Sequence, residues 1–218
     1  MIEKTCVIYQ TPVGFVIWNV LPAGADCMVI EERDERTRKV SIVCITVTGK
    51  LVWRNSSLPD SWWINLSSVT TTQVLLRHFQ NTTNPDVVTV LALSLETGHE
   101  DLPQHEEHTI TVLRPFVYVQ DEPDFETIQT FIRQQTKQEI FLGAEYLETE
   151  RMILISYYTG QPAAFTNVLA CFTRDGSLNW TEEIGTNLKG MGISTFFIVT
   201  DTLFFVKNKT ELVTFRIV

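Results

Sequence analysis

The stretch VCITVTGKLVW (Val43–Trp53) has the pattern of a β-hairpin that ends in a large aromatic ring. Apolar and polar residues alternate up to a Thr-Gly turn, and Trp53 follows Gly49 by four residues. The phrase recurs as Gly14 with Trp18, as Gly176 with Trp180, and as Gly98 without a ring. A strand, a glycine turn and a second strand, repeated along one chain, predict an all-β protein built from repeats.

Alternating apolar runs divide the chain into about five units. The units cover residues 27–54, 63–102, 109–135, 140–180 and 193–217. We therefore expect a small β-propeller of about five four-stranded blades, formed by a single domain over residues 1–218. A β-sandwich is the alternative, because alternation alone does not separate the two architectures; the repeated glycine-to-tryptophan phrase favours blades.

The third and fifth units depart from this pattern. In the third, apolar residues at helical spacing predict a helix over residues 124–135, with Asp124 as its N-terminal cap. The fifth unit ends one strand short at Val218. We expect the N-terminal segment, with Gly14–Trp18 as the outer strand after Cys6–Tyr9, to complete that unit and close the ring.

Composition and charge exclude several classes of function. The net charge is −9, which argues against nucleic acid as a partner because phosphate binding needs clustered Lys and Arg. The basic residues between Arg33 and Lys39 alternate with acids and are expected to form a solvated hairpin tip. Four cysteines without a C-x-x-C pair predict neither zinc nor a disulfide framework. No leader or membrane span is expected, so we predict a soluble cytoplasmic protein.

The hairpin phrase and its echoes, LALSLETGHED and LACFTRDGSLNW, resemble the repeat of quinoprotein-type propellers. The wider pattern, with VIEERDERTRKV, WWINL, EYLE and ILISYY, resembles an uncharacterised bacterial family of propeller-like domains of unknown function. The resemblance implies the fold. It does not imply the quinone cofactor, because the quinoprotein enzymes are more than twice as long and carry a vicinal cysteine pair that this chain lacks. We expect no cofactor.

Two segments could bind a ligand. Three histidines, His99, His105 and His108, lie among carboxylates, and this chemistry suits a metal ion. An exposed acidic connection explains that segment equally well. Trp62 and Trp63, beside Asp60, could form an aromatic platform for a sugar or a proline-rich peptide. Because neighbouring strand residues face opposite sides, we expect one ring to be buried and the other to be exposed.

Catalytic patterns are weaker. Glu145 and Glu148, with nearby tyrosines, suggest the paired carboxylates of a glycoside hydrolase, although acid pairs are common in a chain with 26 acidic residues. A nucleophile elbow and a phosphate-binding glycine loop are absent from the sequence. Trp53 and Trp180 are expected to pack between blades. The sequence favours a noncatalytic interaction module whose partner is an unknown protein or small ligand, with a sugar binder or hydrolase and a metal-binding protein as alternatives.

Overall fold

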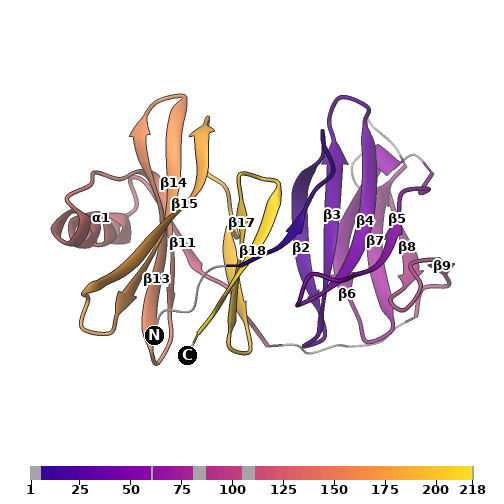
Figure 1. Ribbon diagram of the computed structural model, residues 1–218. Coiled ribbons are helices and arrows are strands. Elements are labelled where there is room, and N and C mark those ends of the chain that lie inside the picture. The colour runs from indigo at the N-terminus through magenta and orange to yellow at the C-terminus, as the bar shows by residue number, and fades with distance from the viewer. Residues whose placement is uncertain (1–5, 60, 81–86, 105–110, 218) are drawn as a thin grey trace. The chain divides into compact units, whose positions relative to one another are not determined.

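The computed structural model describes residues 6–59, 61–80, 87–104 and 111–217. Within these residues the chain forms four antiparallel sheets and one α-helix (Figure 1). The contacts divide the chain into two compact units. One unit holds Leu113–Asn208 with residues 214–217, and the other holds residues 6–112 with Lys209–Val213. None of the described helices is long and apolar enough to cross a membrane.

Two four-stranded sheets form most of the second unit. The first contains β2 (Val16–Ala23), β3 (Cys27–Asp34), β4 (Lys39–Thr46) and β5 (Leu51–Asn55). The other contains β6 (Ile64–Val69), β7 (Gln73–Phe79), β8 (Val88–Ser94) and β9 (Glu100–Asp101), and a short 3-10 helix, η1 (Ser61–Trp63), precedes it. Apolar residues of both sheets share one core, in which Val29, Ile42 and Cys44 meet Ile64, Val74 and Leu76.

The glycine-to-tryptophan phrase has a clear structural role at Gly49 and Gly98. Both glycines have a positive φ, which is the left-handed turn conformation that glycine adopts without strain. Trp53 then returns between the two sheets, and its indole N–H donates to the Leu95 carbonyl at 2.7 Å. A Cβ atom at Gly98 would come within 2.5 Å of the Trp53 ring, so the glycine also makes room for that ring.

A five-stranded sheet and the helix form the main core of the other unit. The sheet has the order β11 (Phe116–Val119), β12 (Phe141–Glu148), β13 (Met152–Gln161), β14 (Ala164–Thr173) and β15 (Leu178–Leu188). Helix α1 (Pro123–Thr136) buries Phe125, Ile128 and Ile132 against it. The helix is thus confirmed, but its cap residue is Glu122, without a side-chain cap bond, because Pro123 begins the helix before Asp124.

The remaining sheet joins strands from distant parts of the sequence. Its order is β1 (Cys6–Gln10), β18 (Glu211–Arg216), β17 (Thr202–Lys207), β16 (Phe196–Val199) and β10 (Val112–Leu113). The first strand of the chain therefore lies beside the last. Two backbone bonds near this junction link Thr11 N–H to the Thr210 carbonyl at 2.9 Å and Ile17 N–H to the Lys209 carbonyl at 2.6 Å.

Two details of the predicted architecture are wrong. The strand beside β18 is β1, whereas the Gly14–Trp18 segment leads into β2 and pairs with β3. The described residues form four sheets where five units were expected. The third unit has no sheet of its own because β10 joins the sheet of β16 and β11 joins the sheet of β12, so those two sheets have five strands each.

Candidate functional site

Strand β3 carries four consecutive charged side chains that are all buried: Glu31, Glu32, Arg33 and Asp34. Alternation along a strand places Glu31 and Arg33 on one face of the sheet and Glu32 on the other. The expectation that Arg33 to Lys39 forms a solvated tip is therefore wrong for Arg33 and Asp34 and correct for the exposed residues 35–39. Strand β3 continues for two residues beyond Glu32. A longer strand in the sequence pattern would have indicated that Arg33 and Asp34 belong to the sheet and not to the hairpin tip.

Glu31 and Arg33 connect β3 to the edge strand of the neighbouring sheet. Arg33 Nε donates to Glu31 Oε1 at 2.6 Å, and its Nη2 donates to the Ile64 carbonyl at 2.8 Å and to the Asn65 side chain. The other oxygen of Glu31 accepts the Leu66 N–H at 2.7 Å. Edge strands have backbone groups without a strand partner, and these two side chains satisfy such groups on β6.

Two tryptophan rings lie against the Arg33 guanidinium. Its central carbon is 4.8 Å from the centre of the Trp18 ring and 5.2 Å from that of Trp62. Arg33 Nη1 also donates to the Trp62 carbonyl at 3.3 Å. A desolvated guanidinium over an indole face is attractive by about 2 kcal/mol. Arg33 therefore contacts both rings while its own donors are bound by Glu31 and β6.

The predicted aromatic pair separates into a partly buried and an exposed ring. Trp62 packs against the core, whereas Trp63 keeps 43% of its surface exposed. Both lie in η1 and not in a strand. Asp60 lies outside the described residues. Trp18 is 57% exposed, and sequence reasoning assigned it only a structural role in the repeat. Its contact with Arg33 joins it to the Trp62 segment, a long-range relationship that the spacing does not reveal.

The opposite face of β3 holds a second charged cluster. Tyr9 Oη donates to Glu32 Oε1 at 2.5 Å, and Arg54 donates to Glu32 Oε2 at 2.5 Å and to Tyr9 Oη at 2.6 Å. Burial and the Glu32 carboxylate raise the pKa of Tyr9 well above its ordinary value of 10.0. The phenol therefore stays protonated and acts as a fixed donor to Glu32. No motif in the sequence predicted this cluster.

The candidate catalytic acids have separate structural partners. Glu145 is fully buried and accepts the Thr195 N–H at 2.9 Å, together with the Ser194 N–H and the Thr195 hydroxyl. Glu148 is instead bound by Arg174 and by the Tyr146 hydroxyl. The two carboxylates lie on opposite faces of β12, since they are three positions apart along the strand, and do not meet across one cleft.

One cavity of the unit that holds helix α1 has a volume of about 640 Å³. Its lining includes the apolar side chains of Leu113, Ile198 and Ile217 and the charged side chains of Arg151 and Asp201. Trp180 lies elsewhere in the same unit, with its ring 5.2 Å from that of Phe215 on β18. This places Trp180 between strands of two sheets, as expected of the repeat.

The metal hypothesis rests on residues of which only one is described. His99 is exposed just before β9, while His105 and His108 lie outside the described residues. Among the residues that the structure describes, no three His, Cys, Asp or Glu side chains are grouped as metal ligands. The three-histidine site therefore stays a prediction.

The fold and site define a mostly β domain whose buried charges serve its architecture. Residues 22–100 match a family model described as a domain of unknown function, DUF4905. The matched stretch contains most of the two sheets of the second unit, including Glu31, Arg33, Trp62 and Trp63, and the chain is similar to that family over this stretch. This family match assigns the chain neither to a propeller family nor to a quinoprotein family. No curated protein and no solved structure matches the chain.

Proposed function

We propose that the chain is a noncatalytic interaction module and that Trp18, Trp62 and Trp63 form its binding site, called here the aromatic site. We further propose that its sheets form a propeller-like array in one domain, residues 1–218. The observation that carries the proposed function is the exposure of Trp18 against a firmly bound Arg33, together with the exposure of Trp63 next to Trp62 in the chain.

Exposed and immobilised indole rings favour binding over a structural role. A tryptophan buries a large apolar area when a partner covers it and loses little conformational entropy if its ring is already fixed. Binding energy in protein interfaces is concentrated in such residues. For Trp18 the rigid support is Arg33, because its guanidinium is bound by a carboxylate, two carbonyls and an amide before any partner arrives.

A pull-down with in-cell photo-crosslinking tests this proposal, using the cytoplasmic fraction of the source cells. We expect a specific partner to be recovered with the wild type and at least tenfold less of it with Trp18→Ala or Trp63→Ala. Phe116→Ala is the control, because it removes an even more exposed aromatic ring from the other unit. Equal recovery with all three variants would contradict the aromatic site.

Sugar binding is the second candidate, because flat exposed rings such as Trp63 also stack on sugar faces. A glycan array with the same variants distinguishes it from the first. Sugar binding is supported if the wild type and Phe116→Ala bind one class of glycan and Trp63→Ala does not. The partner of the aromatic site would then be a carbohydrate and not a protein. A thermal melt of each variant shows whether the fold is intact.

A further inference from the structure

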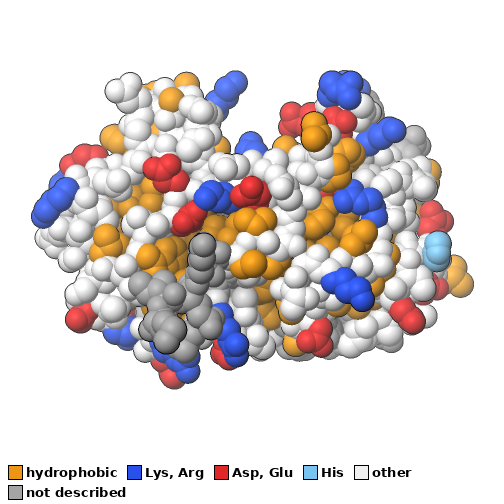
Figure 2. Space-filling model, viewed as in Figure 1, with side chains coloured by type: hydrophobic (Ala, Val, Ile, Leu, Met, Phe, Trp, Pro, Cys, Tyr) orange, Lys and Arg blue, Asp and Glu red, His pale blue; other side chains and the backbone are white. Residues whose placement is uncertain are grey.

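A second pocket opens beside the β3–β4 hairpin, in the unit that contains both strands. Its volume is about 320 Å³, which is within the range of small-ligand sites. Cationic Lys39 and Arg54, the hydroxyls of Ser41 and Ser56, and the ring of Phe15 line it. Figure 2 shows Lys and Arg side chains gathered near this hairpin tip, with acidic side chains beside them.

Arg54 enters the pocket in a fixed orientation. Glu32 and Tyr9 bind two of its N–H groups, on Nη1 and Nη2. A guanidinium has five N–H donors, so its remaining donors are available to a ligand. Glu32 is fully buried and balances the charge of Arg54. Arg54 therefore serves the pocket chiefly as a positioned hydrogen-bond donor.

Lys39 is the second cation of the pocket lining. It makes no ion pair with any described residue and lies on the exposed end of β4. Asp34, the one carboxylate among the described lining residues, is engaged by its own turn: it accepts the Arg36 N–H at 2.9 Å and the Thr37 hydroxyl at 2.6 Å. The Thr37 hydroxyl is the main cause of the lowered pKa of Asp34. Asp34 therefore stays ionised, and the donors of its own turn bind both of its oxygens.

The two serine hydroxyls complete a set of donors. Ser41 and Ser56 lie with their Oγ atoms 2.9 Å apart. In such a pair one hydroxyl donates to the other, so one hydroxyl hydrogen is left to donate elsewhere. Ser41 is buried and Ser56 is exposed, which directs this pair toward the open side of the pocket.

We propose that this pocket binds the phosphate group of a small ligand. The dianion of a phosphate monoester offers acceptors only, and the pocket offers an ammonium, a prepositioned guanidinium and a hydroxyl. The pocket is larger than one phosphate ion, and the Phe15 ring provides an apolar wall for the rest of the ligand. The ligand class is thus a small phosphate monoester, bound independently of the aromatic site.

Titration of the whole chain with inorganic phosphate and with glycerol 3-phosphate tests the proposal, by calorimetry and by amide NMR shifts. We expect saturable shifts at Ser41 and Ser56 and tighter binding of the ester. Lys39→Ala should weaken binding at least tenfold, and Ser56→Ala by a smaller factor. Both changes are at exposed positions, so the fold should persist.

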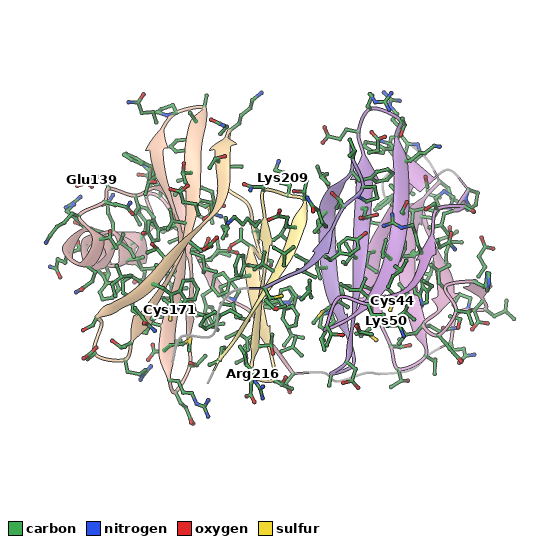
Figure 3. The ribbon with its side chains drawn as sticks, viewed as in Figure 1. Cys44, Lys50, Glu139, Cys171, Lys209 and Arg216 are labelled. Carbon is green, nitrogen blue, oxygen red and sulfur yellow. The ribbon has the colours of Figure 1, made fainter. Side chains whose placement is uncertain are left out.

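The control is Lys50→Ala, which removes an exposed lysine from the opposite end of the same sheet (Figure 3). It should leave phosphate binding unchanged. Non-saturable shifts, equal affinities for all three variants, or stronger binding of acetate than of phosphate would each overturn the proposal. Loss of phosphate binding with the aromatic site intact would leave the proposed function standing.

Discussion

Glu31 and Glu145 perform the same task in two different sheets. Each lies fully buried on the second strand of its sheet and accepts backbone N–H groups from a segment outside that sheet, at Leu66 for Glu31 and at Ser194 and Thr195 for Glu145. They differ in how the buried charge is compensated. Glu31 has the Arg33 guanidinium, whereas Glu145 has only neutral donors among the residues that the structure describes.

The pH dependence of stability should report on Glu145. Burial raises its pKa above the ordinary value of 4.5, so the folded protein retains this proton to a higher pH than the unfolded chain does. The free energy of unfolding should therefore fall as the pH rises from about 4.5 through the raised pKa. Urea unfolding at several pH values between 4.5 and 8 measures the slope, which Glu145→Gln should reduce.

Glu150→Gln is the control for that experiment, since Glu150 is an exposed acid that follows the strand of Glu145 in the chain. Glu31 also has a raised pKa and adds to the slope in both proteins. The pKa values of Asp34, Glu139 and Asp175 are lowered, and these groups contribute equally to the slope of both proteins. An unchanged slope in Glu145→Gln would show that the carboxylate is not desolvated as described.

Removing Arg33 alone should destabilise the protein more than removing the pair. Arg33→Met leaves Glu31 buried without its cation, which costs about 3–5 kcal/mol of unfolding free energy. In the double variant Glu31→Gln with Arg33→Met, the unpaired charge is gone and the amide oxygen still accepts the Leu66 N–H. Denaturant unfolding of both single variants and the double variant gives the coupling energy. Additive losses would contradict a direct Glu31–Arg33 interaction.

Strand positions were readable from the sequence because alternation and glycine turns are local signals. Gln73–Phe79 and the hairpin around Gly49 lie where the pattern placed them. The assignment of strands to sheets was not readable in the third unit, because β10 and β11 are short, β10 lies beside the distant β16, and helix α1 separates β11 from its partner β12. The Arg33 and Arg54 clusters depend on such long-range pairing too. A charged run looks the same in sequence whether it is solvated or buried.

The two glycines Gly98 and Gly24 separate backbone strain from steric overlap. Both have nearly the same positive φ, +72° and +73°, so alanine should cost each about 1–2 kcal/mol in backbone strain. A Cβ at Gly24 meets nothing within 4 Å, whereas one at Gly98 overlaps the Trp53 ring at 2.5 Å. Gly98→Ala should therefore lower the midpoint of thermal unfolding much more than Gly24→Ala. Similar losses would mean that the Trp53 ring can move.

Thiol reactivity should rank the cysteines by their surroundings. Burial raises the pKa of Cys44 to about 12, with a further contribution from Cys27, and burial raises that of Cys171 to about 11 (Figure 3). Cys6 is exposed. Because the thiolate is the reactive form, iodoacetamide at pH 8 should modify Cys6 first and leave Cys44 and Cys171 unmodified in the folded protein.

Peptide mass spectrometry after timed labelling measures each site, and labelling in urea provides the fully reactive reference. Cys44 and Cys171 lie in different compact units. At each of them, the ratio of the labelling rate in buffer to the labelling rate in urea reports how often the surrounding sheet opens. If the two units unfold together, both thiols should gain reactivity at the same urea concentration. Earlier labelling of Cys171 would instead show that the unit with helix α1 opens independently of the unit that contains Trp53.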